Sequence, residues 1–213
     1  MVKILYEDNH LLILEKPAGV ATQSDLSNRY SLEEQAKEYL KITYNKPGEA
    51  FAIPIHRLDK CVSGIVIFAK TSKALSRLNE QLRARTMIKT YTALIEYDPI
   101  PSNGTLIDFI VHDSFKASIV SKDDSQAKQA ILHYQLIGKQ RGYSCLNIIL
   151  ETGRYHQIRA QLANRQWPII GDKKYGSTLF WKENAIALQH SRCELIHPIT
   201  KKNLIMTTTN QLI

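Results

Sequence analysis

The feature that most constrains the fold is a succession of short apolar runs with strand character, separated by turns and by few helical segments. Along Lys89–Tyr97, alternate residues share one side, as a half-buried strand requires. Strands joined by short turns with few helices predict an α+β fold, built on a mixed, mostly antiparallel sheet with flanking helices. The expected strands are Ile4–Tyr6, Leu11–Leu14, Ile65–Ala69, Lys89–Tyr97, Leu106–Val111, Ala130–Ile137 and Tyr143–Leu150.

Helix signals stand at three places. Ser31 and Glu34 form a capping box, which predicts a helix from about Ser31 to Lys41. Thr71 or Ser72 is expected to cap a second helix, whose leucines recur at helical spacing. A third helix is expected to start near Arg154.

The 213 residues contain no internal repeat, low-complexity tract or clear linker. A chain of this length can bury one sizeable core. We therefore expect a single domain over residues 1–213, with two lobes and a central cleft.

Basic residues are in excess and clustered. The chain has 28 Lys and Arg against 20 Asp and Glu, a formal net charge of +8. Between Arg57 and Lys89 there are eight basic residues and two acidic ones. Lys and Arg release counterions when they neutralise phosphates, so this excess favours a polyanionic partner.

Other classes of protein are disfavoured by what the sequence lacks. Its three cysteines are widely separated and its histidines form no HExxH pattern, so neither a disulfide framework nor a metal site is expected. The first residues do not resemble a signal peptide, and no run of 18 apolar residues could span a membrane. A cytoplasmic location with no membrane partner is the expectation.

The most chemically informative segment is His56-Arg57-Leu58-Asp59, which precedes a buried apolar run. Asp59 lies between cations, and nearby opposite charge favours the ionised form of a carboxyl. An ionised, positioned carboxylate is a candidate nucleophile or electrostatic stabiliser. The alternative is a surface ion pair at the start of a strand.

The full string HRLDKCVSGIVIFAKT resembles the active-site motif of the RluA-type pseudouridine synthases. Three other segments resemble the same family in the expected order, followed by a Pro168–Asp172 segment of family type. They are Glu15–Val20, Lys89–Ala93 around Tyr91, and Thr152–Arg159, which resembles TGRxHQIR. The resemblance is to the short, single-domain members without an S4 RNA-binding domain.

This resemblance implies an RNA isomerase that converts uridine to pseudouridine without a cofactor or metal. Asp59 matches the essential aspartate, Arg159 its counter-charge, and Tyr91 the residue that stacks on the base and is the candidate for removing the C5 proton. The implied substrate-binding residues are Arg57, Arg154 and Ile158. Arg57 and Arg154 are expected to contact phosphates or to support the motif loops. Ile158 is expected to pack against the base.

Two departures from the family pattern affect the substrate pocket. Cys61 and Val62 stand where the family has a carboxylate and a hydroxyl. Tyr155 and Gln161 replace a small hydroxyl residue and a second histidine. The expected partner is ribosomal or transfer RNA, and the sequence implies no obligate protein partner.

Two other functions stay open at this point. The first is a non-catalytic RNA-binding protein on the same scaffold, which the Cys61 and Val62 departures favour and the retained Asp59, Tyr91 and Arg159 disfavour. The second is a glycoside or nucleoside hydrolase, which would want a second carboxylate that the Asp59 motif does not supply.

Overall fold

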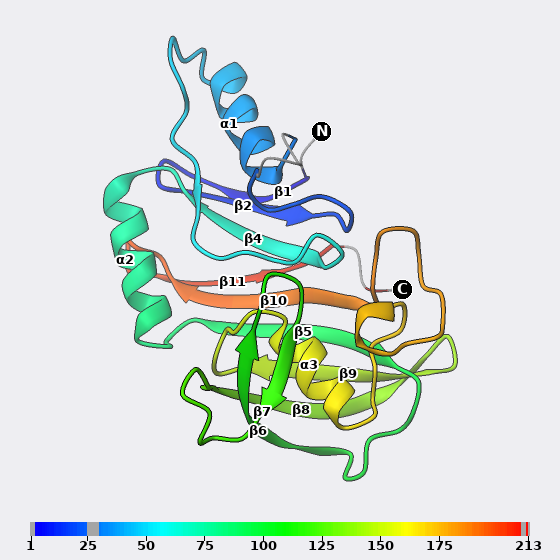
Figure 1. Cartoon of the computed structure of the whole chain (residues 1–213). Helices are drawn as coiled ribbons and strands as arrows, with labels where there is room; N and C mark the ends of the chain where they lie inside the picture. Colours follow the sequence, from blue (N-terminus) through cyan, green and yellow to red (C-terminus); the bar gives the residue numbers. More distant parts are fainter. Residues whose placement is uncertain (1–2, 25–29, 210–211, 213) are drawn as a thin grey trace. The chain divides into compact units, whose positions relative to one another are not determined.

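The computed structural model describes residues 3–24, 30–209 and 212, in two compact units (Figure 1). The first unit comprises Met1–Met87 and His190–Thr209, and the second comprises Ile88–Gln189 and Asn210–Ile213. The chain thus leaves the first unit after Met87 and returns to it at His190. The expectation of a single catalytic domain over residues 1–213 stays a prediction.

The first unit is built on strands in the order β1-β2-β4-β10, with β11 beside β10 and β3 beside β4. The pairs β1–β2, β2–β4, β3–β4 and β10–β11 are antiparallel. The hairpin of β10 and β11 was not expected from the sequence. The strands are β1 (Lys3–Glu7), β2 (Leu11–Lys16), β3 (Ile53–Pro54), β4 (Ser63–Ala69), β10 (Leu188–Ile196) and β11 (Asn203–Thr207).

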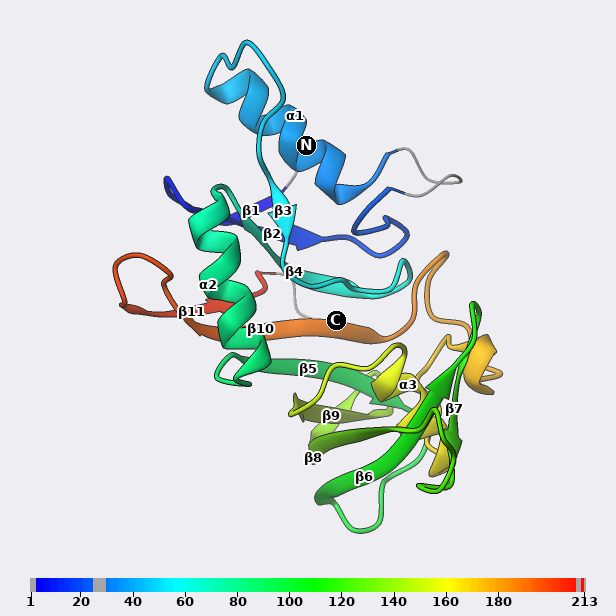
Figure 2. The same cartoon turned by 60° about the vertical axis from the view of Figure 1, so that its left-hand side comes forward.

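The two expected helices of this unit form with the expected caps. In α1 (Leu32–Thr43), the Ser31 side chain accepts a hydrogen bond from the backbone N of Glu34, which confirms the cap. In α2 (Ser72–Arg83), the cap is Thr71, whose hydroxyl accepts from the backbone N of Ala74. Figure 2 shows α1 beside β1 and β2.

The core of the first unit lies between α2 and the sheet. Every residue of β2 is buried, as expected for a strand covered on both faces. Leu11 and Ile13 of β2 pack in one cluster with Ala74 and Leu78 of α2. Ile65 and Ile67 of β4, the strand that follows the Asp59 segment, belong to the same cluster.

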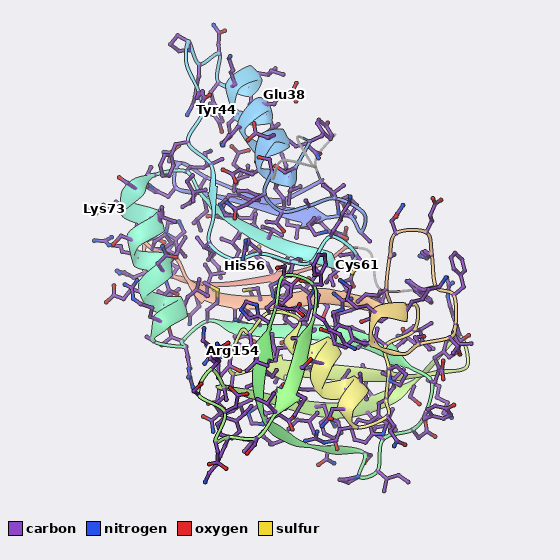
Figure 3. All side chains as sticks on the ribbon, viewed as in Figure 1. Glu38, Tyr44, His56, Cys61, Lys73 and Arg154 are labelled. Atoms are coloured by element: carbon purple, nitrogen blue, oxygen red, sulfur yellow. The ribbon has the colours of Figure 1, made fainter. Side chains whose placement is uncertain are left out.

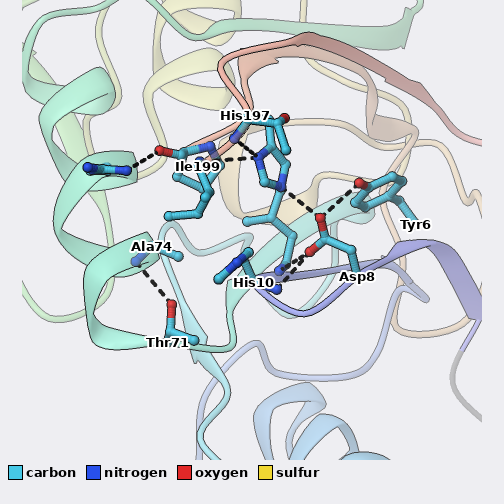
Figure 4. Close-up of polar contacts among 11 residues, drawn as sticks. Tyr6, Asp8, His10, Thr71, Ala74, His197 and Ile199 are labelled. Atoms are coloured by element: carbon cyan, nitrogen blue, oxygen red, sulfur yellow. Dashed lines mark hydrogen bonds and ion pairs between the residues drawn. The ribbon is translucent and has the colours of Figure 1, made fainter.

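A polar cluster joins the turn after β1 to the loop between β10 and β11 (Figure 4). The Nδ1 atom of His197 accepts hydrogen bonds from the backbone N atoms of Ile199 (3.1 Å) and Thr200 (2.9 Å). Nε2 therefore carries the proton and donates to Asp8 at 2.7 Å. Tyr6 donates to the same carboxylate. Both ring nitrogens of His197 therefore make hydrogen bonds that connect the two loops.

The second unit is an antiparallel sheet in the order β5-β9-β8-β6-β7. β9 has the bounds expected from the sequence, whereas β7 was not expected. Tyr97 was expected to share a face with Tyr91, but it lies beyond the end of β5 and is 62 % exposed. The strands are β5 (Ile88–Ile95), β6 (Asn103–His112), β7 (Ala117–Val120), β8 (Lys128–Gln140) and β9 (Tyr143–Leu150).

The third helix starts later than predicted. We expected a start near Arg154, but α3 spans Gln157–Asn164 because His156 adopts a left-handed conformation with φ of 50°. Ala160 of α3 packs against β6, β7 and β8. A short 3₁₀ helix, η1 (Lys173–Tyr175), also contacts this cluster through Tyr175.

These observations confirm the α+β class and the mostly antiparallel pairing. In the part of the chain that the structure describes, no helix is long and apolar enough to cross a membrane.

Candidate active-site motifs

Asp59 lies in the loop between β3 and β4, with His56 and Cys61 on either side of it in the chain (Figure 3). Leu58 is buried and Asp59 partly buried, whereas Arg57 and Lys60 are exposed. The backbone N of Val62 donates to the carbonyl of Asp59 at 3.0 Å, which closes a tight turn. The carboxylate is therefore carried on a turn whose preceding residue is anchored in the core.

Both chain neighbours of Asp59 are bonded to the segment that follows β2. The Thr22 hydroxyl donates to the carbonyl of Leu58 and accepts from its backbone N, each at 3.0 Å. On the other side, the carbonyl of Lys60 accepts from the backbone N of Gly19 at 2.7 Å. These contacts hold the backbone on both sides of Asp59.

The third anchor is Lys16, at the end of β2, whose side chain is fully buried. Its ammonium donates to the carbonyls of Pro17 (2.9 Å), Val20 (2.7 Å) and Lys60 (3.2 Å). Burial disfavours the charged form and lowers the pKa of Lys16 to about 8, while the charges of Cys61 and Asp59 act in the opposite direction. The ammonium thus ties the Glu15–Val20 motif to the Asp59 turn.

A glycine is required where β4 begins. Gly64 has φ of 121°, and a Cβ atom at this position would lie 2.4 Å from the carbonyl oxygen of His190. The Ser63-Gly64 step therefore allows β10 to approach β4 closely. Here His190 Nδ1 donates to the carbonyl of Ile65 at 2.7 Å.

The departures at Cys61 and Val62 differ in their surroundings. Val62 is buried and 3 % exposed, so its apolar side chain suits its site. Cys61 is partly buried, and its electrostatic interaction with Lys16 raises the pKa of the lysine, against the larger effect of burial. The changed residues therefore belong to the anchored turn itself.

Tyr91 lies in the middle of β5, where it pairs with Ile148 of β9. Its side chain is 7 % exposed. Tyr91 thus belongs to the second unit, on a strand with a regular antiparallel register. The role expected for it stays a prediction.

Arg159 of α3 is paired with a carboxylate that was not singled out from the sequence. Its Nε donates to Asp172 Oδ2 at 2.7 Å and its Nη2 to Asp172 Oδ1 at 2.9 Å. The two side chains are 6 % and 1 % exposed. The Arg159 guanidinium carbon also lies 5.0 Å from the centre of the Tyr175 ring. In the sequence, Asp172 could be noticed only as the last residue of the Pro168–Asp172 segment of family type. That segment does not indicate that Asp172 pairs with Arg159.

The other two expected binding residues of this unit are Arg154 and Ile158. Arg154 donates through Nε to the carbonyl of Gln129 at 2.9 Å, and its backbone N donates to Gln157 Oε1 at 3.0 Å. Arg154 was expected either to contact phosphate or to support a motif loop, and these contacts are of the second kind. Ile158 is buried and 4 % exposed.

The two departures in this motif pack α3 onto its sheet. Tyr155 stacks on His156 with ring centres 3.9 Å apart. Gln161 is fully buried, and its Nε2 donates to Asp108 at 2.8 Å. Asp108 also accepts from Arg165, so Gln161 and Arg165 tie α3 to β6.

The basic cluster predicted between Arg57 and Lys89 is only partly at the surface. Arg57, Lys60 and Lys73 are exposed. Lys70 instead has a side chain that is 7 % exposed and pairs with Glu7 at 2.7 Å. Lys70 therefore stabilises the fold and is not placed to bind phosphate.

Within the two units, the structure groups Asp59 and Arg57 in the first and Tyr91, Arg154, Ile158 and Arg159 in the second. Among the described residues, no group of three or more His, Cys, Asp or Glu side chains could hold a metal ion.

The chain is similar to known proteins over most of its length. The family model described as RNA pseudouridylate synthase matches residues 10–164. A ribosomal large subunit pseudouridine synthase D of Xanthomonas campestris is 33 % identical, over 93 % of this chain and 63 % of the relative. An uncharacterized RNA pseudouridine synthase of Bacillus subtilis is 35 % identical, over 95 % of this chain and 66 % of the relative. The chain spans slightly less than two thirds of the length of these relatives.

The fold is also that of a solved structure. Human RNA pseudouridylate synthase domain containing 4 superimposes with a TM-score of 0.81, at 21 % identity, over 97 % of this chain and 88 % of that one.

Proposed function

This chain belongs to the RluA-type pseudouridine synthase family, and we propose that it isomerises uridine in RNA to pseudouridine. The reaction breaks the bond between uracil N1 and ribose C1′ and forms a bond between C5 and C1′. The C5 proton leaves and N1 gains a proton, so atoms and electrons balance without a co-reactant.

The observation that carries the proposal is the anchoring of Asp59 on both sides. Thr22 holds the backbone of Leu58, and Gly19 and Lys16 hold that of Lys60, which supports a fixed backbone at Asp59 between them. A nucleophile or charge stabiliser at the sugar needs this kind of preorganisation. We assign Asp59 that role.

Two further residues complete the proposed chemistry. Arg159 supplies the positive counter-charge, because a guanidinium stays protonated at any working pH. Tyr91 stacks on the base and is the candidate for removing the C5 proton. Arg57, which is exposed on the Asp59 loop, binds a flanking phosphate.

The proposed substrate is a uridine of structured RNA, with large-subunit ribosomal RNA as the first candidate and transfer RNA as the second. The relatives named for the large ribosomal subunit support this order. A stacked uridine must be extruded before it can react, which costs a few kcal/mol and is cheapest in loops and junctions.

The test uses ribosomal and transfer RNA made with uridine tritiated at C5. Isomerisation releases the label to water and leaves pseudouridine, which is then mapped in the RNA. We expect product with the wild-type chain and none with Asp59→Asn, which is isosteric and neutral. Asp123→Asn, in an exposed loop, is the matched control and is expected to keep full activity.

The other outcomes separate the alternatives. RNA binding without product would support a non-catalytic RNA-binding protein, and release of free uracil would support a hydrolase. Full activity of Asp59→Asn would remove Asp59 from the mechanism. Tyr91→Phe is expected to bind RNA and to lose tritium release, because it keeps the ring and lacks the hydroxyl.

A further inference from the structure

The pairing of Arg159 with Asp172 fixes how the guanidinium is turned. A guanidinium has five N–H donors on a rigid plane. The Asp172 carboxylate accepts from Nε at 2.7 Å and from Nη2 at 2.9 Å, so it occupies the edge nearest the side-chain stem. The end formed by Nη1 and the second Nη2 proton is consequently turned away from Asp172.

Asp172 is itself held by its backbone. Its N donates to the carbonyl of Ile169 at 2.9 Å, and its carbonyl accepts from the N atoms of Tyr175 (3.0 Å) and Ser177 (3.1 Å). The carboxylate therefore extends from a turn with little freedom. With a side chain 1 % exposed, it has no access to solvent as an alternative partner.

The Tyr175 ring lies beside the guanidinium, with its centre 5.0 Å from the guanidinium carbon. Its hydroxyl lies 2.8 Å from the N of Ala117, 3.2 Å from the carbonyl of Ala117 and 2.9 Å from His156 Nδ1. A hydroxyl has one proton and two lone pairs, so all three contacts are satisfied when His156 carries a proton on Nδ1. The ring beside Arg159 is thus anchored to β7 and to the residue before α3.

We propose that Asp172 is a positioning residue for the reaction, which holds Arg159 by its Nε edge and presents the opposite end in one orientation. This inference rests on the proposed function, in which Arg159 supplies the counter-charge. A lysine could supply the same charge at position 159, but it has no planar fork for Asp172 to orient. The bidentate pair explains why the site uses arginine.

The experiment compares single-turnover isomerisation and RNA affinity in the full chain. Asp172→Asn removes the charge and keeps the shape, and misplacing one catalytic group is expected to slow the chemical step about 100-fold. The affinity for RNA is expected to change by less than about twofold, because Asp172 is buried and distant from solvent. Asp108→Asn is the matched control, since Asp108 pairs with Arg165 at the end of the same helix. The Asp108→Asn variant is expected to be less stable than the wild type and to isomerise uridine at the wild-type rate.

A second comparison separates positioning from a structural role. In an Arg159→Lys background, Asp172→Asn is expected to slow the reaction by less than about twofold more, because there is no fork left to orient. If Asp172→Asn slows the reaction by the same factor in the Arg159→Lys background as in the wild type, the inference is overturned. If Asp172→Asn does not fold, Asp172→Glu keeps the charge and displaces it by one methylene. A folded Asp172→Glu enzyme with the wild-type rate would overturn the inference. A wild-type chain without product would overturn the proposed function, and the positioning role with it.

Discussion

Thr22 and Leu58 exchange two hydrogen bonds, although they lie 36 residues apart in the chain. The hydroxyl of Thr22 donates to the Leu58 carbonyl and accepts from the Leu58 N, each at 3.0 Å. Both residues are buried, so water cannot replace these bonds. The side chain of Thr22 therefore holds both backbone polar groups of Leu58, the residue that precedes Asp59.

Removal of this hydroxyl is expected to loosen the Asp59 turn. Thr22→Val has nearly the same shape and leaves a buried N–H and a carbonyl without their partner, which costs about 1–3 kcal/mol of unfolding free energy. We expect a lower rate of isomerisation with little change in RNA affinity. Thr22→Ser keeps the hydroxyl and is the control. A Thr22→Val enzyme with the wild-type rate and stability would show that the turn is held without Thr22.

Lys16 is expected to make stability depend on pH in the alkaline range. Its pKa is about 8 in the folded chain, against an ordinary value of 10.5. Between these values the unfolded chain binds a proton that the folded chain has released, so stability rises with pH. The contribution is complete above pH 10.5, declines as the pH falls through about 8, and is absent below it.

The measurement is the free energy of unfolding of the wild type and Lys16→Met at several pH values from 7.5 to 9.5. The difference between the two proteins is expected to rise by up to about 1.4 kcal/mol per pH unit. Lys73→Met, on the exposed face of α2, is expected to follow the wild-type profile (Figure 3). Parallel curves for the wild type and Lys16→Met would contradict the lowered pKa.

RNA binding is expected to weaken steeply with salt, because a chain with a net charge of +8 should bind largely through phosphates. Arg57→Gln is expected to reduce the slope of log affinity against log salt by about 0.7, the value for one phosphate of a single strand. Lys70→Gln is expected to leave the slope unchanged and to reduce stability, since Lys70 is buried against Glu7. Affinity that is independent of salt would contradict the phosphate-binding role.

Asp8 is expected to protect the fold against acid. Burial raises the pKa of this carboxyl, but hydrogen bonds from the backbone of His10 and Leu11 and from Tyr6 and His197 outweigh it and lower the pKa below 3.8. The folded-state pKa is depressed, so the stabilisation is present above about pH 4 and is lost as the pH falls through the lower value. Asp8→Ala is expected to cost about 2 kcal/mol of unfolding free energy at pH 7. That difference should shrink below pH 4, and a constant difference would contradict this account.

Local sequence was sufficient wherever a structure depends on neighbours in the chain. The cap at Ser31 was predicted, and Thr71 was one of two candidate caps with Ser72, because a capping hydroxyl bonds an N–H three residues ahead. β9 was predicted with its bounds because apolar residues cluster between clear turns. The predicted strand end at Tyr97 and the predicted start of α3 near Arg154 were wrong. At the start of α3, His156 has a left-handed backbone and contacts Tyr175, 19 residues later, and such a non-local contact cannot be read from the local pattern.

The motifs around Asp59, Tyr91 and Arg159 could be recognised in the sequence because they resemble the motifs of one family and follow in the same order. By themselves they specify which groups are present, and this was enough to indicate the family. Tertiary structure alone decided that Lys16 is buried against three carbonyls, that Lys70 is buried against Glu7, and that Asp172 orients Arg159. Which groups a side chain contacts depends on distances and burial in the folded chain. Spacing along the sequence specifies neither of them.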